Sequence, residues 1–219
     1  MPTTIRLATS PEDRQRVFEF RYRIYVEEMD RPQNYADHGR GTVEEPLDAT
    51  GRIFLAEDDK GNVIGTLRTN FSRDSDLGIY ETLYGMECAG PLHPMHTSVS
   101  TKFMIAPEMR SGALGVRLAS AGYRYNLREG ILFDFIDCNP HLESTFSRLG
   151  YLAYRDRINH PEYGDVLPLV LALTDHEYLE SIRSPWASIC REHCPRREAN
   201  RRMRDRVSAF QQKQQYQPA

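Results

Sequence analysis

The stretch IAPEMRSGALGVRL, residues 105–118, joins the end of an apolar strand to the start of a helix. The helix is expected over about 112–129, where apolar residues recur at helical spacing. The first amide groups of a helix have no intrahelical acceptor and lie at the positive end of its dipole. A joint made of Arg110, Ser111 and Gly112 would present amides, a hydroxyl and a guanidinium to an anion. This joint predicts a phosphate or pyrophosphate site, or else a serine and a glycine that merely cap a helix.

Strand and helix patterns alternate on both sides of this joint. Ser10 followed by Pro11 and two acids is typical of a helix start. Two polar segments, 30–51 and 72–96, are expected to be a long loop and an irregular region. Further helices are expected over 11–29, 139–151, 174–182 and 186–212, and strands over 3–9, 52–58, 63–71, 98–106, 130–138, 151–158 and 166–173. This order predicts an α/β or α+β fold with a mixed sheet and helices on both faces.

The composition places limits on partners and compartment. The chain has 219 residues, a net charge of −3 and a pI near 6.2, so nucleic acid is not an expected partner. Its apolar runs are too short for an integral membrane segment. Four cysteines do not make a disulfide framework, and we expect a cytoplasmic protein. Cys190 and Cys194 lack further ligands at suitable spacing, so we expect no metal.

The strand, the anion-binding joint, the helix and the next apolar strand, followed by NPHLESTFSRLGY (139–151), resemble the Gcn5-related N-acyltransferase superfamily over residues 52–173. The resemblance implies an α+β fold, an α/β/α sandwich with a mixed, mostly antiparallel sheet, a splayed strand pair and extra C-terminal helices. It implies a transferase domain over 1–183 and a helical extension with a frayed tail over 184–219. In place of a tyrosine that serves many simple acetyltransferases as general acid, this chain has Phe146.

The same resemblance implies where an acyl donor lies. The pantetheine arm of the donor would run along the central strand, and a backbone N–H near Ile105 or Ala106 would polarise the thioester carbonyl. The cofactor-binding residues implied are Met104, Ile105, Ala106, Arg110, Ser111 and Gly112. No permanently bound cofactor is expected, and the acyl-phosphopantetheine donor, on an acyl carrier protein or coenzyme A, is a co-substrate.

The N-terminal half resembles a narrower group. The segments FRYRIYVEEM (20–29), VEEPLDATGRIFLAED (43–58) and VIGTLRTNF (63–71) follow one another as in autoinducer synthases and the related long-chain N-acyl amino acid synthases. Autoinducer synthases have a glutamate and an arginine where this chain has Val99 and Lys102. The chain is therefore more similar to the long-chain acyl amino acid branch.

This resemblance also implies a reaction site. Glu45, Asp48 and Arg68 match catalytic positions, and mutual repulsion between the two acids would raise their pKa values and suit a base. Arg21 and Arg68 would orient the acids or bind the carboxylate of an amino acid. The alternative is a structural ion-pair network that fixes the loop to the first helix. The substrate-binding residues expected are Arg21, Tyr25, Ser100, Phe103 and His141.

Residues after the strand at 130–138 offer other chemistry. His141 is an alternative base, unless Asp137 or Asn139 simply caps a helix there. Cys138 would need a base within reach to act as a nucleophile, and direct transfer is the expected route.

Together these features predict an N-acyltransferase. It would move a medium or long acyl group from an acyl carrier thioester to the amine of an amino acid or similar small molecule by direct aminolysis. An acetyl-CoA-dependent acetyltransferase of a small amine or protein, or a non-catalytic acyl-binding module, are the alternatives. Arg117, Arg124 and Arg128 share one helix face, with Arg110 on the preceding turn and Lys102 nearby. This basic stripe would attract an acidic carrier protein, or else it is a solvated face balanced by acids elsewhere.

Overall fold

The computed structural model describes residues 2–193. The chain divides into two compact units. The first unit joins Met1–Asn70 to Ser100–Gly122, and the second joins Phe71–Val99 to the chain from Tyr123 onward. The predicted helix over 186–212 and its polar tail lie outside the described residues from position 194 onward.

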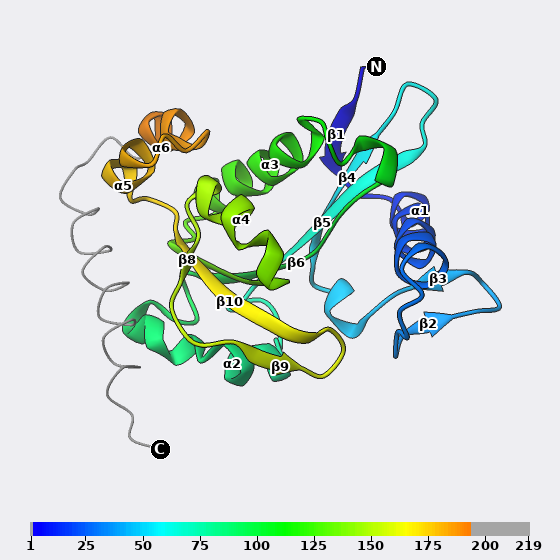
Figure 1. Cartoon of the computed structure of the whole chain (residues 1–219), viewed down its shortest axis with the longest axis horizontal. Helices are drawn as coiled ribbons and strands as arrows, with labels where there is room; N and C mark the ends of the chain where they lie inside the picture. Colours follow the sequence, from blue (N-terminus) through cyan, green and yellow to red (C-terminus); the bar gives the residue numbers. More distant parts are fainter. Residues whose placement is uncertain (1, 194–219) are drawn as a thin grey trace. The chain divides into compact units, whose positions relative to one another are not determined.

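The sheet of the first unit has the strand order β1-β4-β5-β6 (Figure 1). Strand β4 pairs antiparallel with β1, and its antiparallel pairing with β5 confirms the predicted strand-turn-strand pattern. The connecting turn is stabilised by Asp58, whose carboxylate accepts the backbone N–H groups of Lys60 and Asn62 at 2.9 and 2.7 Å. The strands are β1 (Thr4–Leu7), β4 (Arg52–Glu57), β5 (Val63–Phe71) and β6 (Thr97–Ile105).

The first helix begins as predicted. Helix α1 covers Pro11–Tyr22, and the Ser10 side chain accepts the N–H of Asp13 at 3.1 Å. The prediction of one regular helix to residue 29 is wrong, because the segment Arg23–Glu28 widens into a π-helix. Short π segments of this kind are frequent at functional sites.

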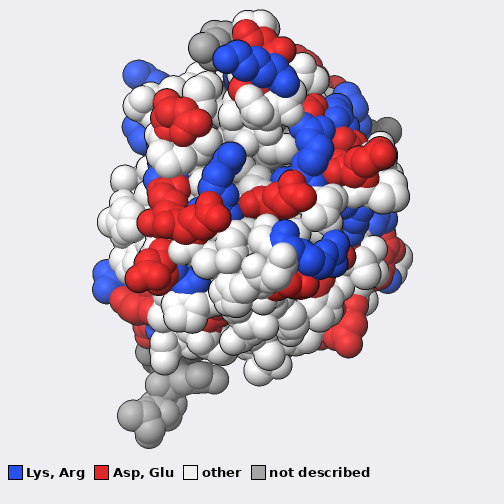
Figure 2. Space-filling view, turned by 90° about the vertical axis from the view of Figure 1, so that its right-hand side faces the viewer, with Lys and Arg blue, Asp and Glu red and all other residues white. Residues whose placement is uncertain are grey.

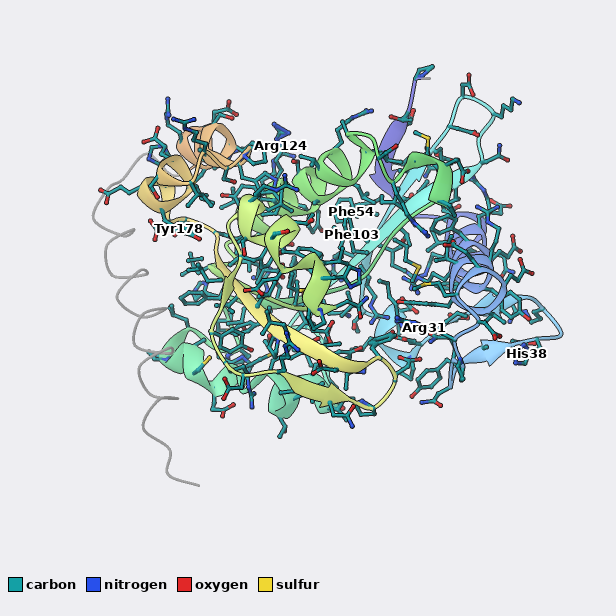
Figure 3. All side chains as sticks on the ribbon, in the orientation of Figure 1. Arg31, His38, Phe54, Phe103, Arg124 and Tyr178 are labelled. Carbon is teal, nitrogen blue, oxygen red and sulfur yellow. The ribbon has the colours of Figure 1, made fainter. Side chains whose placement is uncertain are left out.

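The segment predicted as one long loop, residues 30–51, contains regular structure. A short hairpin pairs β2 (Ala36–Asp37) with β3 (Thr42–Val43), and Pro46–Asp48 forms a 3₁₀ turn. The hairpin contacts α1 through His38, labelled in Figure 3, whose ring nitrogen lies 2.9 Å from the Tyr22 hydroxyl oxygen.

The second unit continues from the first residues of β6. Strand β7 (Phe133–Cys138) pairs with β6 in parallel over Thr97–Val99, and antiparallel with β10 (Gly164–Ala172). Strands β8 (Leu152–Ala153) and β9 (Ile158–His160) pair antiparallel with β10. Antiparallel pairs therefore predominate in a mixed sheet, and the predicted α+β class is confirmed.

Helices complete the two units (Figure 1). Helix α3 starts at Leu114, two residues later than predicted. The segment predicted to be irregular, 72–96, instead contains α2 and a 3₁₀ segment. Within residues 2–193, no helix is long and apolar enough to cross a bilayer. The remaining helices are α2 (Ile79–Tyr84), α3 (Leu114–Arg128), α4 (Glu143–Leu149), α5 (His176–Ser181) and α6 (Ala187–His193).

Candidate active site

Two carboxylates flank the 3₁₀ turn that precedes β4. Pro46 occupies the first position of the turn, which suits its fixed φ angle. The backbone N–H of Glu45 donates to the carboxylate of Asp48 at 2.7 Å, and the N–H of Asp48 donates to the carbonyl of Glu45 at 2.9 Å. This local cycle fixes the side chain of Asp48 against the backbone of Glu45.

Three cations from distant parts of the first unit surround these carboxylates. Arg21 donates from one Nη atom to both oxygens of Asp48, at 2.9 and 2.8 Å. Arg68 reaches Asp48 at 3.0 Å and Glu45 at 2.9 Å. Lys102 pairs with the other oxygen of Glu45. We call these five residues the buried ion cluster, because their side chains are at most 6% exposed.

The electrostatics of the cluster correct the sequence-based expectation for its acids. Burial raises the pKa of Glu45, but Lys102 and Arg68 outweigh it and hold that pKa below its ordinary value. Burial acts in the same direction on Asp48, and Arg21 and Arg68 again lower the pKa of the carboxyl group. The expectation that mutual repulsion would raise both values is wrong, because each acid contacts two cations.

Lys102 is held in an unusual backbone conformation. Its φ angle is +54° in the middle of β6, a region that side-chain-bearing residues rarely occupy. Its ammonium group lies 5.0 Å from the centre of the Tyr25 ring, and Tyr25 comes from the π segment after α1. Lys102 was expected near the basic stripe, but its side chain has no exposure and belongs to the buried ion cluster. A strained backbone conformation of this kind persists only where the surrounding contacts hold the residue in place.

Burial alternates over the last residues of β6 and the residue that follows it. Ser100, Phe103 (labelled in Figure 3) and Ile105 are partly exposed, whereas Met104 and Ala106 are buried. The N–H of Ala106 donates to the carbonyl of Ile64 at 2.9 Å. It is therefore not free to polarise a thioester, and the prediction that named it is wrong on that point.

The predicted anion-binding joint has a different local structure from the one expected. The N–H of Gly112 donates to the carbonyl of Met109 at 3.2 Å, so a bare amide at Gly112 is not found. Ser111 is exposed, and Arg110 forms an ion pair with Glu28. The amides without helical acceptors are those of the first turn of α3, which begins at Leu114.

Three candidates from the sequence lie in the second unit, whereas the buried ion cluster lies wholly in the first. His141 is exposed on a 3₁₀ turn. Asn139 occupies the capping position of that turn but makes no side-chain cap, so this capping expectation is wrong. Burial, followed by the charges of Asp137 and Glu143, raises the pKa of Cys138 to about 12, so its thiolate is scarce at neutral pH.

The sequence missed two contacts of functional interest. The first is the contact of Lys102 with Glu45. The sequence did indicate that Lys102 is buried, because the strand period of two puts it on the same side as the apolar residues Met104 and Ala106. The second is the contact of Glu28 with Arg110, which no sequence pattern indicated, since these residues are 82 positions apart.

The exposed surface carries charges of both signs. Among the described residues drawn in Figure 2, basic and acidic side chains are interspersed rather than gathered in one field. Arg117, Arg124 and Arg128 are exposed on α3, as a surface stripe requires. Within residues 2–193, no group of three or more His, Cys, Asp or Glu side chains is arranged to hold a metal ion.

Solved structures of acyltransferases resemble this chain. TofI, solved in a ternary complex with an inhibitor and MTA, is 17% identical with a TM-score of 0.65, over 87% of this chain and 100% of its own. FeeM, an N-acyl amino acid synthase from uncultured soil microbes, is 15% identical with a TM-score of 0.61, over 86% and 99%. BjaI, a CoA-dependent acyl-homoserine lactone synthase, is 17% identical with a TM-score of 0.62, over 91% and 97%. At these identities the likeness shows a shared fold.

No curated protein matches the sequence. The model of the family described as N-acyl amino acid synthase FeeM matches residues 16–175, well over half of the chain, and includes all five members of the buried ion cluster. The protein is therefore an acyltransferase that belongs to the FeeM family of N-acyl amino acid synthases.

Proposed function

We propose that the protein transfers a medium or long acyl group from an acyl carrier thioester to the amine of an amino acid. The observation that carries this proposal is the position of Arg21 in the buried ion cluster. One Nη atom of Arg21 donates to Asp48, whereas its Nε and other Nη atoms are buried with no hydrogen-bond partner within residues 2–193, in a cluster of three cations and two carboxylates. The carboxylate of an amino acid acceptor would accept from these donors and add a further negative charge.

Glu45 is the member of the cluster that we assign to catalysis. Its side chain is 6% exposed, whereas that of Asp48 has no exposure and contacts both arginines. The lowered pKa keeps Glu45 ionised, so it attracts the ammonium group of the acceptor. The ammonium group first loses one proton to solvent, because only the neutral amine has a lone pair for the attack. As the amine nitrogen bonds to the thioester carbon, it becomes far more acidic and releases a second proton to Glu45. The C–S bond then breaks, and the thiolate leaves with the carrier and takes a proton from solvent.

Asp48, Arg21 and Arg68 are positioning residues in this scheme. Asp48 is bonded to both guanidinium groups and to the backbone of Glu45, and Arg68 also donates through Nε to Thr101 at 3.1 Å. These bonds fix the direction of the Glu45 carboxylate. The structural network considered from the sequence and the catalytic site are thus the same residues in two roles.

The donor is assigned to β6 and the turn that follows it. Its pantetheine arm would lie along the residues from Met104 to Ala106, and its phosphate at Arg110, Ser111 and the first turn of α3. Exposed arginines on α3 support a carrier protein as donor. BjaI and MesI are described as CoA-dependent, so coenzyme A is the alternative donor, and the experiment must distinguish it from a carrier protein.

The test uses acyl carrier proteins and acyl-CoA thioesters of several chain lengths, each with a pool of amino acids. We expect free thiol to appear with the carrier donors, and mass spectrometry to find acyl amino acids. Reaction with coenzyme A donors alone contradicts the carrier assignment. Donor binding without thiol release contradicts transfer.

Two substitutions test the site. Glu45→Gln should lower kcat by about 10²–10⁴-fold, the usual contribution of a general base. Glu44→Gln, the exposed neighbouring acid, is the matched control and should leave kcat unchanged. Equal rates for both variants remove Glu45 from the mechanism. Ser111→Asp should weaken donor binding by repulsion of the phosphate, and unchanged donor affinity places the phosphate elsewhere.

A further inference from the structure

We propose that Glu28 is a specificity-determining residue for the acyl donor. Its carboxylate occupies Arg110 until the donor phosphate displaces it, and its charge disfavours donors that carry several phosphates. The inference rests on the proposed position of the donor phosphate.

The contact between the two residues has the geometry of a bound anion. The Nη1 and Nη2 atoms of Arg110 donate to the two carboxylate oxygens of Glu28 at 2.6 and 2.9 Å. The Nε atom of Arg110 donates to the carbonyl of Ile105 at 2.9 Å, which anchors the guanidinium at the end of β6. A two-pronged contact of this kind is also the one that arginine makes with phosphate. Glu28 is therefore a resident competitor for the donor.

The pair is accessible enough to exchange partners. The side chains of Arg110 and Glu28 are 47% and 29% exposed, so water screens their attraction. Exposed ion pairs contribute little, and displacing one weakens ligand binding by about two- to fivefold. The donor phosphate can therefore replace the carboxylate at a modest cost in affinity.

The same charge distinguishes the two classes of donor. Glu28 and the exposed Glu108 place two negative charges near Arg110, so the turn has little surplus positive charge. The phosphodiester of a carrier-bound pantetheine arm requires one positive group. Coenzyme A instead carries a pyrophosphate, which includes the pantetheine phosphate, and a phosphomonoester on its ribose, and these extra charges are repelled by carboxylates within a Debye length. Glu28 thus favours the carrier-bound arm.

The experiment measures dissociation constants by calorimetry for pantetheine, 4′-phosphopantetheine and coenzyme A. Glu28→Gln should bind 4′-phosphopantetheine about two- to fivefold more tightly, with a larger gain for coenzyme A and none for pantetheine. Glu27→Gln is the matched control, because it removes the same charge from the preceding exposed residue. It should leave the three constants close to those of the wild type.

A second pair of variants separates this inference from the donor assignment. In an Arg110→Gln background, Glu28→Gln should no longer tighten phosphopantetheine binding. If Arg110→Gln weakens the phosphorylated ligands but Glu28→Gln changes nothing, the inference about Glu28 fails and the donor assignment stands. If Arg110→Gln also changes nothing, the donor phosphate does not bind at this turn. An equal gain for pantetheine or for Glu27→Gln overturns the inference too.

Discussion

Replacing Asp48 by asparagine removes one charge from the centre of the buried ion cluster. The carboxylate receives three donors, from Arg21 at 2.8 and 2.9 Å, from Arg68 at 3.0 Å and from the backbone of Glu45 at 2.7 Å. An amide of nearly the same shape cannot neutralise the two guanidinium groups. Three cations then face one carboxylate, so the surplus charge of the cluster rises from one to two. The side chains of Asp48, Arg21 and Arg68 have no solvent exposure.

The expected cost follows from this loss of pairing. Removing one partner of a buried ion pair destabilises a protein by about 3–5 kcal/mol. With a urea m-value of about 2–3 kcal/mol/M, the unfolding midpoint of Asp48→Asn should fall by about 1–2 M. The assay is urea unfolding followed by circular dichroism at pH 7, with equal m-values as the condition for comparing midpoints.

A matched variant makes this prediction refutable. Asp59→Asn removes the same charge from an exposed turn and should change the free energy of unfolding by less than about 0.5 kcal/mol. If Asp48→Asn unfolds at the same urea concentration as Asp59→Asn, the cluster does not carry a net charge that Asp48 compensates. The proposal that an amino acid carboxylate balances the cluster then loses its physical basis.

Three further outcomes are expected. The folded state lowers the pKa values of Glu45 and Asp48, so the stability that these carboxylates supply is fully present above their unfolded-state pKa values near 4. This stability is lost as the pH falls through their folded-state pKa values. Urea midpoints that stay constant from pH 6 to pH 3 would contradict this sign. Cys138→Ser should retain acyl transfer, measured as thiol release, because the thiol is protonated at neutral pH; complete loss of activity in a folded variant would restore a covalent route. Gly150→Ala should lower stability by about 1–3 kcal/mol in urea unfolding, since φ is +123° there and a Cβ would lie 2.5 Å from Leu179; an unchanged midpoint would show that the α4 terminus relaxes freely.

Local rules account for the elements that the sequence predicted correctly. The start of α1 depends on one serine side chain and one proline, and the β4–β5 turn depends on Asp58 and its neighbours four residues away or fewer. The stop of α4 at Gly150 depends on a backbone angle that glycine tolerates. Such contacts join residues only a few positions apart, so they can be inferred from the composition and spacing of the sequence.

Other local elements were not predicted, because the polar residues around them hide any apolar period. The hairpin of β2 and β3 has strands of two residues each, too short for a period to show. Helix α2 has six residues after a glycine with φ of +57°, in a segment rich in glycine and proline. The π segment after α1 has an apolar spacing close to that of an ordinary helix, so the spacing did not distinguish the two.

The sequence by itself determined the α+β class, the resemblance to acyl amino acid synthases and the identities of the acids and arginines at the site. Only the tertiary structure decided their charge state and partners. Glu45 and Lys102 are 57 positions apart, Arg21 and Asp48 are 27 apart, and Glu28 and Arg110 are 82 apart. Whether a carboxylate has a raised or a lowered pKa depends on which charges lie within a few ångströms of it and on its burial, and neither quantity is a property of neighbours in the chain.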